Sequence, residues 1–316
     1  MRVLVTGSTG YVGSRLVPAL LEAGHDVVAA ARTPARVADY PWGDQVEVRE
    51  FDVEDPAAIA TAVAGTDAVV YLIHSMDGGD FVEKDREAAR LVAAACDRAG
   101  VGRIVYLSGL VPDGELSDHL ASRLEVEEIL LEAATPATVL RAAMVIGAGS
   151  TSYELLARLT HRVPVTPVPT WMRSRVQPVA VDDVLATIVA ALEGEPRNRH
   201  YDLGGDEVLS YPDLVALTAR LDSRWRPQVV VPLVPQWVVG RAASLLTGLD
   251  SSTTRSLVES LRHDMVCAED DVRRELLPPD FRFTGLEESL RRAARGRPVG
   301  TEVGEDPLAP APTDPA

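Results

Sequence analysis

The sequence has very little lysine, and its charge balance is strongly acidic. Lys84 is the single lysine in 316 residues, and 31 basic side chains against 47 acidic ones leave a net charge of −16 at pH 7. Because nucleic-acid phosphates require clustered cations, this balance argues against nucleic acid as a ligand. Arginine carries the positive charge, and we interpret this as a general bias in amino-acid composition that indicates no particular site.

Cysteine and long apolar runs are also scarce. Cys96 and Cys267 have no metal-ligand spacing, so we expect two buried or half-buried thiols, no metal site and a reducing compartment. No apolar run reaches the ~18 residues of a membrane span, and no signal peptide precedes the first predicted strand. We therefore expect a soluble, cytoplasmic protein. The apolar share of 46% predicts a sizeable core in one large domain or two small ones.

The strongest pattern in the chain is its first stretch, MRVLVTGSTGYVGSRLVPALL. A short apolar run at 3–5 predicts a buried strand, and apolar residues after Gly13 recur at helical spacing. Gly7, Gly10 and Gly13 therefore lie where a strand turns into a helix. Gly7 suits the tight turn, Gly10 lets a pyrophosphate approach the backbone, and Gly13 lets the helix pack closely. The free N–H groups of the helix favour phosphate, so the motif predicts dinucleotide binding rather than a mere tight turn.

The second predicted strand, 26–31, ends beside two arginines. In NAD-binding folds an acidic residue near this point holds the ribose hydroxyls, and here there is none. Arg32 follows the strand directly, and Arg36 comes one helical turn later. A guanidinium at this place can pair with a 2′-phosphate. The pattern favours NADP over NAD, and the alternative is two solvated arginines on a loop.

Further strands and helices alternate along the first half of the chain. Five βα units with short links predict an α/β fold, a doubly wound parallel Rossmann sheet with right-handed crossovers. The strand at 68–73 is apolar throughout, as a central parallel strand should be. His74 leaves its carboxyl end, the edge at which such sheets bind ligands. We expect His74 to contact the cofactor's backbone or water rather than to be catalytic. Later strands are expected at 46–51, 103–107 and 138–141, and helices at 81–99 and 117–133.

These motifs resemble the short-chain dehydrogenase/reductase superfamily in its extended and atypical branches. The glycine spacing is similar, and Asp52-Val53 resembles the acidic-apolar pair beside the adenine ring. The stretch 142–147 resembles the R-P-x-x-V-x-G segment near the nicotinamide, with Ala142 in the proline's place. The run YLIHSM, the Gly-Leu after the fifth strand and the H-L-x-S-R helix resemble an NmrA-like bacterial subgroup of NAD(P)H-binding oxidoreductases. The resemblance covers residues 1–290.

The resemblance implies a set of cofactor-binding residues in the glycine loop and at the strand ends. They are Gly7, Ser8, Thr9, Gly10, Tyr11, Val12, Gly13, Arg32, Arg36, Asp52, Val53, Leu72, Ile73, His74, Ser108, Arg123, Ala142, Met144 and Val145.

The predicted catalytic residues depart from the superfamily's usual pattern. Active members carry a serine after the fifth strand and a Tyr-x-x-x-Lys on the next helix, where the cation lowers the tyrosine's pKa. Ser108 matches the serine, but His119 and Arg123 stand at the same i, i+4 spacing instead of tyrosine and lysine. Histidine can donate a proton near neutral pH, whereas arginine supplies a permanent charge. We predict Ser108, His119 and Arg123 as catalytic, and the alternative for the pair is an exposed helix start.

Beyond residue 150 the chain changes character. We expect the Rossmann domain over 1–150 with a return segment at 175–205, a small substrate lobe from 151–174 and 206–295, and a disordered tail over 296–316, which is rich in Pro, Gly and acid. The proline-punctuated stretch 163–171 predicts no regular element. For the apolar stretch 229–249, packing in the core or a substrate wall is favoured over membrane contact.

Two classes of function remain open. The first is an NADP-dependent oxidoreductase that acts by hydride transfer on an unidentified small substrate, with a monomer or homodimer as the assembly. The second is an NADP(H)-binding redox sensor or scaffold without turnover, which the absence of Tyr-x-x-x-Lys favours. Trp171, Met172 and Trp237 suggest that a substrate would be fairly apolar.

Overall fold

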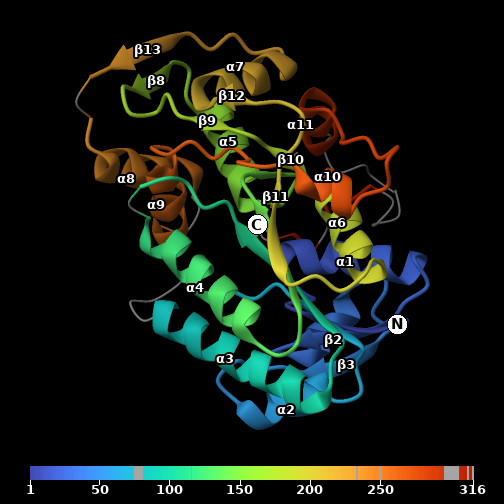
Figure 1. The fold of residues 1–316 in the computed structure, drawn as a ribbon. Coiled ribbons are helices and arrows are strands. Elements are labelled where there is room, and N and C mark those ends of the chain that lie inside the picture. The colour runs from blue at the N-terminus through green and yellow to red at the C-terminus, as the bar shows by residue number, and fades with distance from the viewer. Residues whose placement is uncertain are drawn as a thin grey trace.

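A seven-stranded parallel sheet forms the centre of the molecule (Figure 1). The computed structural model describes residues 1–74, 81–114, 116–232, 234–248, 251–294, 306–311 and 313–314. The strand order β11-β6-β5-β4-β1-β2-β3 confirms the predicted doubly wound Rossmann fold. The strands are β1 (Arg2–Thr6), β2 (Asp26–Ala31), β3 (Glu47–Glu50), β4 (Ala68–Tyr71), β5 (Arg103–Gly109), β6 (Ala137–Ala142) and β11 (Arg199–Leu203).

Helices cover both faces of this sheet. One face carries α1 (Tyr11–Glu22) and α6 (Val181–Glu193), and the other carries α2 (Pro56–Val63), α3 (Phe81–Ala99) and α4 (Asp118–Glu132). The side chains between the sheet and α1 and α6 form a first core cluster, and those between the sheet and α2, α3 and α4 form a second. Because successive side chains of a strand point to opposite faces, Val3 and Val5 belong to the first cluster and Leu4 to the second. All three are fully buried. The apolar runs of the sequence are therefore explained by two flanking helical layers.

The order of the strands reverses direction at β1. Val3 pairs with Val27 of β2 on one side and with Ala68 of β4 on the other. The connections from β1 and β4 therefore leave the sheet to opposite faces, and a crevice opens outside their carboxyl ends. Ligands of open α/β sheets bind at such a switch point. The 3₁₀-helix η1 (Pro34–Asp39) follows β2 beside it.

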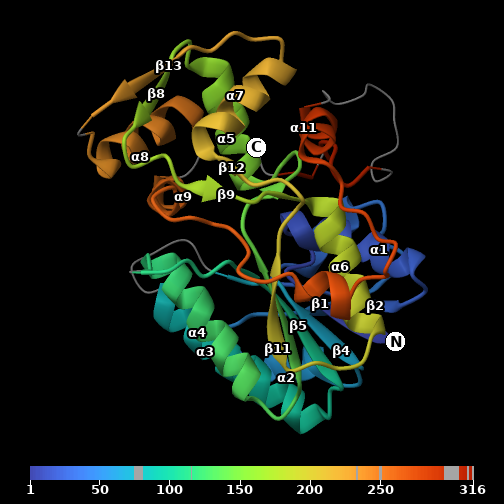
Figure 2. The same cartoon turned by 45° about the horizontal axis from the view of Figure 1, so that its top comes forward.

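The small lobe lies beyond the carboxyl edge of the sheet (Figure 2). Its helices are α5 (Thr151–Arg162), α7 (Tyr211–Leu221), α8 (Gln236–Thr247), α9 (Ser251–Ser260) and α11 (Leu286–Ala294), and the short α10 (Asp271–Glu275) lies against β11. Three two-stranded sheets complete the chain: β7 (Val145–Ile146) with β10 (Val179–Ala180), β9 (Arg175–Val176) with β12 (Leu209–Ser210), and β8 (Thr166–Pro169) with β13 (Gln228–Val231).

The prolines of 163–171 do not prevent a strand, so that prediction is wrong. β8 pairs in parallel with β13, and Thr166 N–H donates to Pro227 O at 2.9 Å. Pro167 and Pro169 are two apart, so the donors that they lack fall on the same edge of β8, the edge that faces away from β13. Proline is compatible with such an edge.

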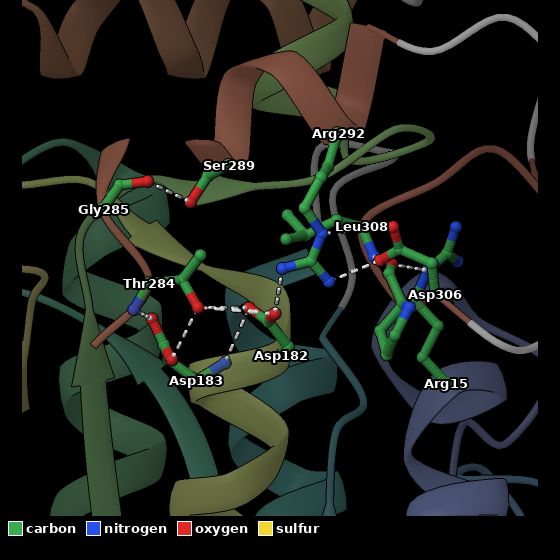
Figure 3. A network of polar contacts seen from close by, with 10 residues as sticks. Arg15, Asp182, Asp183, Thr284, Gly285, Ser289, Arg292, Asp306 and Leu308 are labelled. Carbon is green, nitrogen blue, oxygen red and sulfur yellow. Dashed lines mark hydrogen bonds and ion pairs between the residues drawn. The ribbon is translucent and has the colours of Figure 1, made fainter. Parts of the chain in front are cut away.

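The end of the chain packs against the Rossmann domain (Figure 3). Leu308 is fully buried, its carbonyl accepts from Ala148 N–H at 2.9 Å, and Arg15 of α1 donates to the carbonyl oxygen of Pro307. Arg292 of α11 binds Asp306 through two hydrogen bonds. This packing of 306–311 and 313–314 differs from the disorder that the sequence predicts for 296–316; residues 295–305, 312 and 315–316 lie outside the described residues.

Candidate functional site

The glycine loop between β1 and α1 has the geometry that the motif predicts. Gly7 has φ +64°, which favours glycine, and Gly10 N–H donates to Gly7 O at 2.9 Å. A Cβ on Gly13 would lie 2.3 Å from Gly7 O, so the turn and the helix can pack only when this residue is glycine. Gly10 is the N-cap of α1, is exposed, and provides no side-chain cap. The first turn of α1 is therefore open to an anionic ligand.

Side chains behind the loop hold its backbone. Ser8 is fully buried, and both its Oγ, at 3.0 Å, and its N–H, at 3.3 Å, donate to Ala30 O, so the residue holds the turn against the sheet. Tyr40 Oη donates to Thr9 O at 2.7 Å. Trp42 stacks on Tyr40 with ring centroids 4.9 Å apart and donates from Nε1 to the carbonyl of residue 14. Sequence reasoning missed both aromatic residues, because no spacing pattern links them to the loop.

The end of β4 lies directly beside the glycine turn. A Cβ on Gly7 would be 3.5 Å from Ile73 Cγ1 and 3.8 Å from Leu72 Cβ. Leu72 N–H donates to Thr6 Oγ1 at 3.0 Å, which joins the ends of β4 and β1. Leu72 and Ile73 are therefore in place to line the crevice.

The predicted phosphate-selecting arginines are solvent-exposed at the end of β2. Arg32 follows the strand and Arg36 lies in η1, and in the described part of the chain neither forms an ion pair. Asp52 and Val53 follow β3. Asp52 Oδ1 accepts from Glu54 N–H at 3.0 Å, and Val53 packs against the second core cluster.

Two histidines and an arginine meet beyond the carboxyl ends of β4 and β5. Ser117 Oγ accepts from Leu120 N–H at 3.4 Å and begins α4, so His119 and Arg123 lie one turn apart on one face. Arg123 Nε donates to His119 Nε2 at 3.2 Å, and its Nη1 lies 3.5 Å from the carbonyl oxygen of residue 107 in β5. The His74 and His119 ring centroids are 6.1 Å apart. The sequence did not indicate this pairing of histidines.

Burial and the charge of Arg123 lower the pKa values of both histidines. Burial first, and then the neighbouring Arg123 guanidinium, lower the pKa of His119 to about 3. The same guanidinium holds the pKa of His74 well below its usual value. Because His119 Nε2 accepts a hydrogen bond, the single proton of the neutral ring is on Nδ1. The sequence-based expectation of a charged histidine that titrates near its ordinary pKa is therefore wrong.

Ser108 lies at the end of β5 but is closed off from solvent. Its side chain is 2% exposed, and Oγ has no hydrogen-bond partner among the described residues. By the alternation of the strand it points to the face that carries α3 and α4. Its neighbour Gly109 lies under α4, where a Cβ would be 3.5 Å from Arg123 Cδ.

The predicted nicotinamide segment adjoins the same edge. Gly109 pairs with Ala142 at the end of β6, and Leu110 N–H donates to Ala142 O at 3.1 Å. Met144 O accepts from the N–H of residue 179 at 2.9 Å, and Val145 begins β7. Behind this segment, Tyr11 Oη would lie 2.1 Å from a Cβ on Gly147. The predicted residues thus gather along the carboxyl edge of the sheet.

Within the described residues no group of three or more histidine, cysteine, aspartate or glutamate side chains could hold a metal ion. The described helices include none with the length and apolarity needed to cross a bilayer.

Comparisons with known proteins relate the chain to NAD(P)H-binding proteins. A model of the NAD(P)H-binding family matches residues 7–169. Subunit 9 of the alpha subcomplex of mitochondrial NADH dehydrogenase from Arabidopsis thaliana is 28% identical over 72% of this chain. A ceramide reductase from Caulobacter vibrioides is 31% identical over 60% of this chain. The chain matches only 60% of the length of each of these relatives.

Solved structures share the fold over nearly the whole chain. The triphenylmethane reductase of Citrobacter sp. complexed with NADP(H) has a TM-score of 0.73 at 18% identity, covering 93% of this chain and all of that one. The NADPH-dependent quinone oxidoreductase of Escherichia coli complexed with NADPH has a TM-score of 0.73 at 20% identity, covering 91% of this chain and 98% of that one. These likenesses show the fold, and the family model, which covers about half of the chain, shows that the chain belongs to the NAD(P)H-binding family.

Proposed function

We propose that the protein is an NADP-dependent oxidoreductase that transfers a hydride between the nicotinamide and a small, fairly apolar substrate. The observation that carries the proposal is the placement of the His119–Arg123 pair at the same edge of the sheet as the glycine turn, with one strand, β4, between β5 and β1. β1, β4 and β5 are neighbours in the sheet, so a dinucleotide on the turn extends toward this pair along one edge.

The residues present fit a dinucleotide phosphate. The uncapped first turn of α1 and the bare Gly10 would hold the pyrophosphate. Arg32, with Arg36, would bind the 2′-phosphate, because an exposed guanidinium without an ionic partner is free to pair with it. Arg123 would place the nicotinamide ribose by hydrogen bonds. Leu72, Ile73, Ala142 and Met144 would line the crevice between these points.

The chemistry available beside the nicotinamide is electrostatic. When bound, the cofactor supplies a hydride from C4 of its nicotinamide ring. The guanidinium of Arg123 stabilises negative charge that develops on a substrate oxygen, and His119 Nδ1–H can donate a hydrogen bond to it. Neither residue releases a proton at neutral pH, so water supplies the proton that completes a reduction. This favours acceptors whose reduced anion is stable, such as quinones, over simple ketones.

Steady-state oxidation of NADPH with a panel of acceptors tests this function. The panel contains a quinone, an aldehyde and a long-chain ketone, the last chosen because one relative is a ceramide reductase. We expect turnover fastest with the quinone, and His119→Ala should lower kcat about 10²–10³-fold, as for loss of one donor to an oxyanion. Arg98→Ala, an exposed arginine at the end of α3, is the matched control. Unchanged kcat in His119→Ala would remove this residue from the mechanism.

The second candidate function is an NADP(H)-binding redox sensor or scaffold without turnover. The neutral His119 and the missing Tyr-x-x-x-Lys favour it, because the site then lacks a proton donor near neutral pH. This candidate predicts tight NADPH binding with no oxidation by any acceptor in the panel.

A further inference from the structure

The far end of the small lobe exposes large apolar side chains. Trp225 is 83% exposed, Trp237 68% and Leu245 79%. Trp237 and Leu245 belong to α8, and Trp225 precedes β13; in Figures 1 and 2 these two elements lie at the end of the lobe farthest from β2 and β3. We call this surface the distal face, made of Trp225, Val229, Val230, Trp237, Leu245 and Leu246, each at least 43% exposed. Of the two packings that the sequence predicts for 229–249, the core packing is wrong for Val229, Val230, Trp237, Leu245 and Leu246, and the substrate wall stays a prediction.

Hydrogen bonds join the elements of the distal face. Arg226, next to Trp225, donates from Nε to the carbonyl of Thr160 in α5 at 2.9 Å. Arg162, at the end of the same helix, donates to the carbonyl of Leu246 in α8. Trp171 Nε1 donates to Val234 O at 2.8 Å and fixes the link between β13 and α8. The exposed apolar side chains therefore stand on one connected framework.

Helix α8 has its large apolar residues on the outside. Its buried residues are small: Gly240, Ala243 and Thr247. A Cβ on Gly240 would lie 3.7 Å from Arg255 Cα, which shows how closely α9 packs on this side. Trp237 and Leu245 are eight residues apart, so they share the outer face of the helix. A soluble helix normally has the reverse arrangement.

The charge around the distal face is opposite to that of the whole chain. The segments 151–181 and 220–248, which include α5, β8, β13 and α8, contain eight arginines, one glutamate and one aspartate, in a chain of net charge −16. Arg224 and Arg241 are exposed, and within the described residues neither forms an ion pair. The elements of the distal face are therefore rich in arginine, and two exposed arginines, Arg224 and Arg241, come from the same segments as its apolar side chains.

We propose that the distal face docks on an anionic phospholipid surface. Tryptophan prefers the boundary between headgroups and acyl chains, where its ring is apolar and its N–H meets water. Leucine and valine side chains enter the acyl boundary, and arginines bind lipid phosphates. The charge pattern favours this occupant over a second copy of the chain, because two distal faces in contact would bring their arginines together. This proposal is independent of the reaction proposed above.

Vesicle flotation tests the docking, with the full chain and without cofactor. Vesicles of phosphatidylcholine alone are compared with vesicles that also contain phosphatidylglycerol. We expect binding to the anionic vesicles, weaker at high salt because the phosphate contacts are screened. The double variant Trp237→Gln/Leu245→Gln should bind about 10-fold or more weakly, and Arg224→Glu/Arg241→Glu should do the same. Val208→Gln changes a 44%-exposed valine outside the face and is the matched control.

Three results would overturn the proposal. The first is no flotation with anionic vesicles, and the second is an equal loss of binding in Val208→Gln. The third is a concentration-dependent dimer that Trp237→Gln/Leu245→Gln abolishes while vesicles bind nothing, which would assign the face to a second copy. Circular dichroism of each variant confirms its fold. The NADPH affinity of each variant should be unchanged, so that a loss of vesicle binding is not a loss of the cofactor site, and the docking proposal and the proposed reaction fail or succeed separately.

Discussion

The two ends of the molecule place valine in opposite environments, although both ends expose arginines. At the dinucleotide end, Val3 and Val5 are fully buried between two layers of helices, and Arg32 stands outside the strand end. At the distal end, Val229 and Val230 are half exposed, because within the described residues β13 pairs only with β8 and no helical layer covers these two side chains. An apolar run thus predicts burial only where the topology supplies a covering layer.

This comparison separates what local sequence determines from what it does not. A glycine turn between a strand and a helix needs only neighbouring residues to take its shape, so its function can be predicted from the local sequence. The distal face depends on which sides of α8 and β13 meet the rest of the lobe. Single substitutions at the dinucleotide end should therefore change the cofactor affinity sharply. Substitutions at the distal end should change only what its surface binds.

The largest effect should come from a side chain in the glycine loop. Gly10→Val places its Cβ 3.1 Å from Gly7 O and fills the approach of the pyrophosphate, so NADPH affinity should fall at least about 100-fold. Gly13→Val, whose Cβ would meet Gly7 O at 2.3 Å, should also disturb the fold. Isothermal titration measures the affinity. Gly240→Ala at the distal end is the control and should bind NADPH normally; unchanged affinity in folded Gly10→Val would contradict the loop assignment.

A smaller effect should distinguish the two cofactors. Arg32→Ala should weaken NADPH by about 1.5–3 kcal/mol, the range for a charge-assisted hydrogen bond, and leave NADH almost unchanged. Titration of the variant with each nucleotide measures both affinities. Equal losses for NADPH and NADH would mean that Arg32 does not recognise the 2′-phosphate.

Acid should destabilise the protein through the buried histidine. The pKa of His119 is about 3 in the folded protein, whereas the unfolded chain takes up this proton near pH 6.5. The neutral His119 therefore leaves the free energy of unfolding at its full value above pH ~6.5. This free energy decreases as the pH falls from ~6.5 toward 3, because the unfolded chain then binds the proton more readily than the folded one. Between pH 7 and 5, the free energy of unfolding should drop by about 1–2 kcal/mol more in the wild type than in His119→Asn. Equal drops in urea titrations would place His119 in solvent.

The smallest effect should come from the end of the chain. Asp306→Ala removes one of the two carboxylates that bind Arg292, and Asp182 remains, so the cost should be only about 1 kcal/mol. Thermal unfolding measures it as a decrease of a few degrees. Asp44→Ala, an exposed carboxylate in the Rossmann domain, is the control. A Tm equal to that of the control would mean that the terminal segment adds no stability.

Much of the fold and half of the site could be predicted from the sequence. Apolar runs, glycines and capping residues such as Ser117 act on their neighbours, so they predicted the sheet, the glycine turn and the start of α4. Tyr40 on Thr9 and Asp314 on Arg15 join residues 31 and 299 positions apart, and no local pattern encodes such contacts. The pKa of His119 depends on burial under the folded chain, which spacing alone does not reveal.

The central claim is that this site transfers a hydride from NADPH. The most direct test uses NADPH labelled with deuterium at C4 of the nicotinamide, the quinone acceptor and mass spectrometry of the nucleotide formed. We predict that one C4 position alone loses its label, with a primary isotope effect on a rate that His119→Ala lowers. Binding of the labelled NADPH without loss of deuterium from either position, whatever the acceptor, would contradict the claim and identify a nucleotide-binding protein without turnover.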